Sequence, residues 1–293
     1  MSTRVRPSGQ RRRRLRGNED MMLKLMYITN DPKTALIAEQ AGVDRIFVDL
    51  ETVGKELRQG GMNTVQSHHT LEDVKALRQV LSKSELLVRV NQIYPGSENE
   101  IDEAIRSGAD VLMLPYFKCA EQVRIFLRAV AGRARTMLLF ETPEAVENLD
   151  GILSLDGIDE CFIGLNDLHL GYHMKFMFQL LADGTVEKLC RRFAEAGKPY
   201  GFGGIARVGG GMLPAERILG EHVRLGSSAV ILSRSFCNTA EITSYDEIDA
   251  IFRAEVPKIR AAERTYRTLD AEGLAANQLL VQQAVRQIME NMS

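Results

Sequence analysis

The chain has 293 residues, of which 45% are hydrophobic and 26% are charged, and its net charge is −2. This composition is typical of a globular enzyme with a large core, and a near-neutral charge gives no general field that would attract nucleic acid. Four cysteines lack CxxC spacing, and no apolar run approaches the roughly 20 residues of a membrane span, so we expect a cytoplasmic protein with reduced thiols and no signal peptide.

Residues 1–20 differ from the rest of the chain. They are rich in arginine and almost free of apolar residues, and Met21 and Met22 offer alternative starts directly after them. Like charges at this density cannot pack into a core, so we expect a disordered basic tail. An arm that binds nucleic acid or an anionic surface is the alternative.

From Leu23 onward, short apolar runs alternate with amphipathic helical patterns. The expected strands cover residues 23–28, 44–51, 85–91, 110–115, 199–205 and 228–232, with two more inside the stretches 138–148 and 161–168. Their apolar residues are continuous, which is typical of parallel strands covered on both faces. Eight such units predict an α/β fold, a (β/α)8 TIM barrel, over residues 21–240.

Two further helices, over residues 245–269 and 274–292, follow the eighth strand, so residues 241–293 are expected to form C-terminal helices. The second carries an apolar stripe at helical spacing: Val281, Val285, Ile288 and Met292. Because a barrel needs only one of these helices, the stripe is expected to pack on a neighbouring subunit or on its own barrel.

Two acids follow apolar runs in the fifth and sixth strand regions. Glu141 follows Leu138-Leu-Phe140, and Asp167 follows Cys161-Phe-Ile-Gly-Leu-Asn166. Barrel strands present ligands at their C-terminal ends, so these acids are expected to hold one divalent cation through oxygen. The alternative is that Glu141 only caps the next helix, although Thr142 and Glu144 can do so without it.

Other strand ends supply the remaining polar candidates. Arg89 lies in an apolar strand, where a guanidinium is costly unless it meets an anion, either a substrate carboxylate or a structural partner at Asp49 or Glu51. The glycine-rich segment 203–211 with Arg207, and the sequence Ser233-Arg234-Ser235, stand where barrels often bind phosphate, with tight turns and salt bridges as the alternative.

Four motifs together resemble the HpcH/HpaI aldolase and citrate lyase β-subunit family: Val48-Asp-Leu-Glu51, Val88-Arg-Val-Asn91, Phe140-Glu-Thr-Pro-Glu-Ala-Val146 and Phe162-Ile-Gly-Leu-Asn-Asp-Leu168. The resemblance implies a barrel related to phosphoenolpyruvate- and pyruvate-using enzymes. It implies that Glu141 and Asp167 hold Mg2+, with Mn2+ or Co2+ as alternatives. It also implies that Arg89 binds the carboxylate of a keto acid or acyl-CoA acid. A C-terminal helix exchanged between subunits would give a homo-oligomer, a trimer or hexamer.

The chain departs from this pattern at two places. Thr52 stands where the aldolase branch carries a catalytic His, and Leu139 stands where it carries a Gln. The base is therefore open among His68, His69, Glu51 and a metal-bound water. The other expected site residues are Asp49 for catalysis and, for substrate binding, Asn91, Gly164, Asn166, Arg207, Arg234 and Ser235.

The expected function is that of a metal-dependent, class II-type aldolase, a carbon–carbon lyase acting on a pyruvate-like 2-keto acid and an aldehyde. A CoA-ester lyase or hydrolase of the citrate lyase or malyl-CoA lyase type is the first alternative. A barrel that binds a ligand without catalysis is the second.

Overall fold

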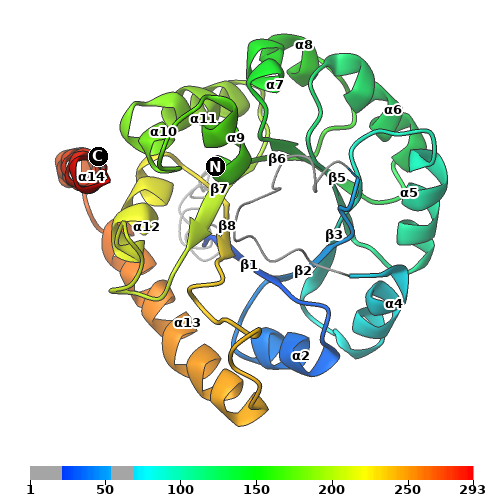
Figure 1. The fold of residues 1–293 in the computed structure, drawn as a ribbon, viewed down its shortest axis with the longest axis horizontal. Coiled ribbons are helices and arrows are strands. Elements are labelled where there is room, and N and C mark those ends of the chain that lie inside the picture. Colours follow the sequence, from blue (N-terminus) through cyan, green and yellow to red (C-terminus); the bar gives the residue numbers. More distant parts are fainter. Residues whose placement is uncertain (1–21, 54–68, 293) are drawn as a thin grey trace, which may run out of the picture.

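Eight short apolar runs form a closed barrel of parallel strands in the computed structural model, which describes residues 22–53 and 69–292 (Figure 1). Each strand pairs with the next in sequence, and β1 pairs with β8 to close the barrel. The strands are β1 Lys24–Ile28, β2 Arg45–Asp49, β3 Glu85–Arg89, β4 Val111–Leu114, β5 Arg135–Phe140, β6 Glu160–Ile163, β7 Tyr200–Ile205 and β8 Ala229–Leu232.

Helices surround this barrel on the outside, and the expected (β/α)8 fold with C-terminal helices is confirmed (Figure 1). They are α2 Pro32–Gln40, α4 Leu71–Val80, α5 Ser97–Arg106, α6 Ala120–Val130, α7 Pro143–Glu147, α8 Leu149–Leu153, α9 Leu165–Gly171, α10 Gln179–Ala182, α11 Thr185–Glu195, α12 Ala215–Arg224, α13 Tyr245–Arg267 and α14 Ala271–Asn291. None of the described helices has the length and apolar content needed to cross a membrane.

The strands are buried on both faces, which explains their continuous apolar sequences. One layer of side chains, including Phe47, Met113, Leu139 and Phe162, fills the barrel interior. A larger layer lies between the strands and the surrounding helices. The same inner side chains form the bottom of the cavity at the barrel mouth.

An ion network fills the barrel at the N-terminal ends of its strands. The fully buried Arg45 side chain donates from Nη1 and Nη2 to both carboxylate oxygens of Glu160, at 2.9 Å each. It also contacts Glu85 at 2.7 Å. Lys24 and Arg135 complete the network with further ion pairs to Glu85. A buried guanidinium is tolerated here because each end of its fork meets a carboxylate.

The last two helices lie outside the barrel on one side (Figure 1). Helix α13 packs on α2 and α12, while α14 packs on α12 and α10. The α14 stripe buries Val281 and Val285 against this chain's own barrel, and Asn277 donates to the Arg217 carbonyl at 3.0 Å. Val281 and Val285 therefore pack on this chain's own barrel, which was one of the two expected arrangements. Met292, at the end of the stripe, is exposed.

Candidate active site

A cavity of about 410 Å³ opens at the C-terminal ends of the strands. Its apolar wall includes Phe47, Met113, Leu139 and Phe162, from the layer that fills the barrel. The charged residues that line it are Asp49, Glu51, Arg89, Glu141, Asp167 and Arg234. Most of the expected catalytic and metal residues thus meet in one space.

Glu141 directly follows β5 and is buried, with 4% of its surface exposed. Its Oε1 accepts a hydrogen bond of 3.0 Å from the backbone N–H of Tyr116, a residue with φ of 49°. A non-glycine residue in this left-handed region is strained, and such residues cluster at functional sites. Thr142, not Glu141, caps the following helix by accepting from the N–H of Ala145.

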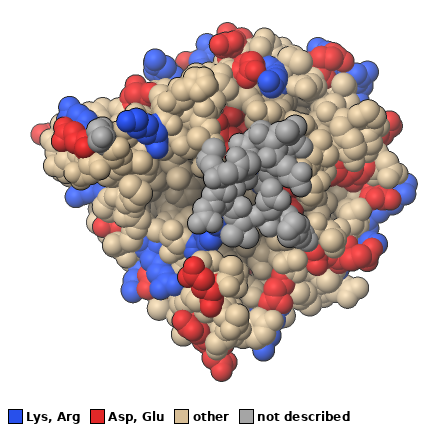
Figure 2. Space-filling model, in the orientation of Figure 1, with Lys and Arg blue, Asp and Glu red and all other residues tan. Residues whose placement is uncertain are grey.

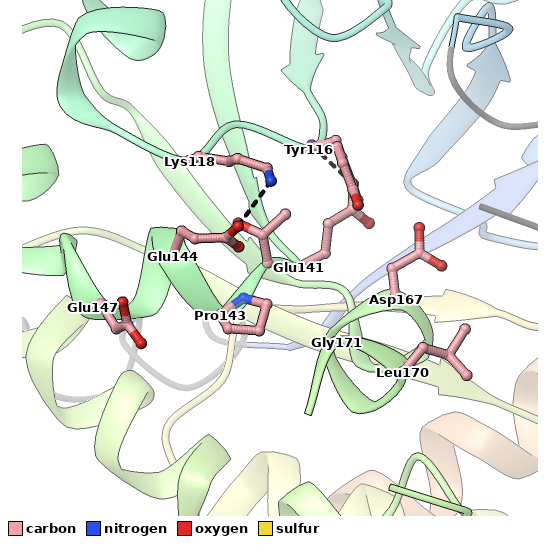
Figure 3. Close-up of a pocket in the computed structure, with 10 residues that line it drawn as sticks. Tyr116, Lys118, Glu141, Pro143, Glu144, Glu147, Asp167, Leu170 and Gly171 are labelled. Atoms are coloured by element: carbon pink, nitrogen blue, oxygen red, sulfur yellow. Dashed lines mark hydrogen bonds and ion pairs between the residues drawn. The ribbon is translucent and has the colours of Figure 1, made fainter. Parts of the chain in front are cut away.

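Asp167 comes from a helix and not from a strand end, which corrects the sequence expectation. Strand β6 stops at Ile163, and Gly164 turns the backbone into α9, so Asp167 stands in the first turn of that helix. Figure 3 shows its carboxylate and that of Glu141 facing the same space. Asn166 donates to Asp167 Oδ1 at 3.1 Å.

The Glu141 and Asp167 pair suits a divalent cation by the nature of its donors. Carboxylate oxygens are the preferred ligands of hard cations, and Mg2+ commonly keeps several waters while one or two protein carboxylates bind it. Over residues 22–53 and 69–292, no group of three or more His, Cys, Asp or Glu side chains could hold a metal.

Arg89 meets carboxylates of its own chain. It donates from Nε and Nη2 to the two oxygens of Asp49, both at 2.8 Å, and its Nη2 lies 3.4 Å from Glu51 Oε2. Burial would lower the pKa of Arg89, but the charges of Asp49 and Glu51 outweigh that effect and raise it. Arg89 therefore forms the expected structural ion pair with Asp49. In that pair Arg89 donates only from Nε and Nη2.

Asn91 does not line the cavity and instead holds the chain after β2 in place through hydrogen bonds. Its side-chain oxygen accepts from the N–H groups of Thr52 and Val53 at 2.8 Å each, and its amide donates to Glu100 at 2.8 Å. His69 accepts a hydrogen bond at Nδ1 from the N–H of Asp49 at 3.0 Å and is also not among the described lining residues. His68 lies outside the described residues, as does the tail 1–20.

The ends of β7 and β8 contribute a more open part of the wall. Arg234 lines the cavity with Ser233, Gly203 and Gly204, whereas Ser235 is exposed and lies outside the lining. Arg207 is not in the lining, because its Nε donates to the carbonyl of Phe236 at 2.7 Å. Arg207 thus links the loops after β7 and β8, and only Arg234 of this pair faces the cavity.

A second cavity of about 520 Å³ shares Glu141 and Asp167 with the first (Figure 3). Lys118 lies on its wall and donates to Glu144 at 2.7 Å. That hydrogen bond raises the pKa of Lys118, which keeps the amine charged. Tyr116 also lines this space and was missed by sequence reasoning, since nothing in the sequence signals that its backbone N–H would meet Glu141.

Comparison with known proteins shows which family the chain resembles. Residues 24–210 match the model of the HpcH/HpaI aldolase/citrate lyase family. A "hydroxypyruvate/pyruvate aldolase" of Roseobacter denitrificans is 27% identical over 203 residues, which cover 58% of this chain and 72% of that protein. A "2-keto-3-deoxy-L-rhamnonate aldolase" of Klebsiella pneumoniae is 28% identical over 201 residues, covering 57% and 69% respectively.

Solved structures show the same fold at low identity. An HpcH/HpaI aldolase from Desulfitobacterium hafniense superposes with a TM-score of 0.59 at 19% identity, covering 75% of this chain and 89% of that one. The citrate synthase SbnG gives a TM-score of 0.58 at 15% identity, covering 86% and 97% respectively.

Proposed function

Because the chain belongs to the HpcH/HpaI aldolase/citrate lyase family, we propose that it is a class II-type aldolase that joins or cleaves a pyruvate-like 2-keto acid and an aldehyde. The observation that carries this proposal is the meeting of Glu141, Asp167 and Arg89 in one cavity at the barrel mouth. Barrel enzymes carry out their chemistry at this end.

Glu141 and Asp167 would hold a divalent cation, with Mg2+ as the first candidate and Mn2+ or Co2+ as alternatives. Such a cation supplies a Lewis acid for the keto oxygen of the substrate. The Tyr116 N–H orients the Glu141 carboxylate, and Asn166 restrains Asp167. Gly164 keeps the space around Glu141 open, since a side chain there would collide with it.

Arg89 is assigned to the keto-acid carboxylate, and Asp49 to holding the Arg89 guanidinium. The pair with Asp49 uses Nε and Nη2, so the keto-acid carboxylate is assigned to Nη1. The ring of Phe47 lies 5.6 Å from the guanidinium carbon and restrains the side chain further. Asn91 would act indirectly, by fixing the chain that follows Asp49 and Glu51.

Glu51 is the base that the geometry supports best. It lines the cavity and lies 3.4 Å from Arg89, which we assign to the substrate. In the cleavage direction it would accept the proton of the substrate hydroxyl, and in synthesis it would return that proton. His69 accepts the Asp49 N–H at Nδ1 and is absent from the described lining, so a neutral His69 would carry its proton on Nε2.

The described residues offer no neutral lysine for a Schiff-base mechanism in the central cavity. No lysine among them lines the central cavity, and Lys118 in the neighbouring cavity is held as a cation by Glu144. A Schiff-base lysine needs a neutral amine, which usually requires a lowered pKa. This favours charge stabilisation through the pair Glu141 and Asp167.

The test is a substrate panel with purified protein, Mg2+ or Mn2+, pyruvate and a series of aldehydes. We expect pyruvate to disappear as an aldol product forms, and chelation of the metal to stop the reaction. Turnover of CoA esters with no aldehyde reaction would favour the citrate lyase type. No turnover of either class would favour a barrel that only binds its ligand.

The outer face of α14 supports a homo-oligomer. Leu279 and Leu280 are exposed by 60% and 42%, although neighbouring side chains of the same helix are buried on this chain's barrel. Apolar side chains exposed together on one helix commonly mark a subunit contact. Light scattering of wild-type protein and of a Leu279→Glu, Leu280→Glu variant tests this; an equal mass for both would contradict it.

A further inference from the structure

The proposed base Glu51 lies just beyond the paired part of strand β2. The register of β2 with β3 ends at the pair Asp49 and Arg89, two residues earlier in the chain. The Glu51 side chain is only 2% exposed, and it lines the central cavity. Contacts other than regular strand pairing must therefore hold the chain on either side of Glu51.

The side-chain amide of Asn91 supplies contacts on both sides of Glu51. Its Nδ2 donates to the carbonyl of Leu50 at 3.3 Å. Its Oδ1 accepts from the N–H groups of Thr52 and Val53 at 2.8 Å each. An amide turned the other way would set donors against donors and an acceptor against an acceptor. The orientation of this one amide therefore decides whether the backbone around Glu51 is held.

Glu100, on helix α5, fixes that orientation from a place outside the cavity lining. Its Oε1 accepts from Asn91 Nδ2 at 2.8 Å and from the Asn91 backbone N–H at 3.1 Å. An ionised carboxylate only accepts hydrogen bonds, so it pairs with the amide nitrogen and repels the amide oxygen. Glu100 thus directs the oxygen of Asn91 towards the chain after β2.

Ion pairing does not explain the Glu100 carboxylate, since it has no ion pair with the residues that the structure describes. Burial raises the pKa of Glu100 more than the hydrogen bonds from Asn91 lower it. Its own helix, Ser97-Glu-Asn-Glu-Ile-Asp-Glu-Ala-Ile-Arg106, is acidic, and Figure 2 shows acidic side chains over this part of the face. A carboxylate is costly in such surroundings, and its bonds to Asn91 are what the structure offers in return.

We propose that Glu100 is a positioning residue for the reaction: it orients the Asn91 amide, and Asn91 in turn holds Glu51 where it can take the substrate proton. This inference rests on the proposed aldolase function and on Glu51 as the base. A base must lie within hydrogen-bond reach of the proton that it removes. A misplacement of about 1 Å can lower the rate by roughly 100-fold, even when its cause lies far from the chemistry.

Two substitutions of Glu100 separate its hydrogen bonds from its charge. Glu100→Leu removes the acceptor, so we expect kcat with Mn2+, pyruvate and the aldehyde that the wild type uses fastest to fall by roughly 10- to 100-fold. KM for pyruvate and Mn2+ affinity should change little, because we assign them to other residues. Glu100→Gln keeps a carbonyl oxygen that can accept from Asn91, and it should restore most of kcat. Glu100→Met replaces Glu100→Leu should that variant fail to fold.

A double-mutant cycle tests whether Glu100 acts through Asn91. Asn91→Ala removes the amide, so adding Glu100→Leu to it should lower kcat no further. Glu103→Leu, at an exposed position about one turn further along α5, is the matched control. It should leave kcat unchanged in the wild type and in Asn91→Ala.

Amide hydrogen exchange at Thr52 and Val53 gives a measurement that does not depend on turnover. Both N–H groups donate to Asn91, so we expect them to exchange roughly 10-fold faster in Glu100→Leu than in the wild type. Glu100→Gln and Glu103→Leu should exchange at the wild-type rate. Equal exchange in all four proteins would show that Glu100 does not hold this segment.

Three results of the activity measurements would overturn the inference. They are an unchanged kcat in Glu100→Leu, a Glu100→Gln variant as slow as Glu100→Leu, or a further loss of kcat when Glu100→Leu is added to Asn91→Ala. In each case the wild type still condenses pyruvate with an aldehyde, so the aldolase function would stand. If the wild type uses no aldehyde at all, the aldolase function itself is wrong and the role of Glu100 falls with it.

Discussion

Gly164 and Glu141 are in such close contact that a Cβ atom at position 164 would stand 2.8 Å from Glu141 Oε2. Gly164, which directly follows β6, therefore leaves room for the carboxylate of Glu141, which directly follows β5. Two elements of the barrel are fitted to each other at the proposed metal site. This relationship has a direct mutational consequence.

Replacement of Gly164 by Ala should displace the Glu141 carboxylate. Because Glu141 Cβ would also stand only 2.9 Å away, the side chain cannot avoid the contact by a small rotation. We expect Mn2+ affinity to fall by roughly 10- to 100-fold, as for other losses of ligand support. Calorimetry of Mn2+ binding measures this. Gly151→Ala is the control, since nothing lies within 4 Å of its Cβ position; equal affinities in the two variants would contradict the prediction.

The buried ion network below the site should be important for stability. Arg45→Met would leave Glu160 and Glu85 without their fully buried partner, at a cost of about 3 kcal/mol. Urea unfolding measures the loss. Arg253→Met, which breaks the exposed pair with Asp249, should leave the unfolding midpoint unchanged. If Arg45→Met also leaves the urea unfolding midpoint unchanged, the network does not contribute to the stability of the fold.

The same network should limit stability in acid. Burial would raise the pKa of Glu85, but Arg45, with Lys24 and Arg135, lowers it from 4.5 to about 2. The stability that Glu85 contributes is therefore complete above about pH 4.5 and is lost as the pH falls towards 2, because the unfolded chain takes up the proton first. Urea midpoints across this range should fall less steeply in Glu85→Gln than in the wild type. If the urea midpoints of the two proteins fall equally steeply with pH, Glu85 is not the group that limits stability in acid.

The assignment of the base distinguishes two residues that both follow β2 in sequence. Glu51→Gln keeps the size of the side chain and removes the proton acceptor, so we expect kcat for pyruvate and aldehyde to fall by roughly 100- to 10,000-fold. His69→Asn should have the smaller effect, since His69 is absent from the described cavity lining. A larger loss in His69→Asn would transfer the base role to His69.

Much of the fold was predictable from the sequence because each strand is a continuous apolar run. The helix signals were equally local: Asp31 caps α2 ahead of Pro32, and Thr70 and Asp73 form a capping box on α4. Glu141 was recognisable because it directly follows β5. These features depend on residues close together in the chain.

The remaining features depend on contacts between distant segments. The apolar run before Asp167 predicts a strand end, but the turn at Gly164 places this residue on α9. The partner of Arg89 was open between substrate and its own chain, and only the register of β2 with β3 brings Asp49 opposite it. Asn91 was assigned to substrate, whereas its amide contacts Glu100 and the chain after β2.

The most direct test of the central claim combines metal binding with turnover in Glu141→Ala and Asp167→Ala. Each protein is treated with chelator, titrated with Mn2+ by calorimetry, and assayed with pyruvate and aldehyde. We expect both variants to lose Mn2+ binding and condensation while they retain the wild-type fold by circular dichroism. Full activity of either variant after metal is restored would contradict the assignment of Glu141 and Asp167 as the metal site.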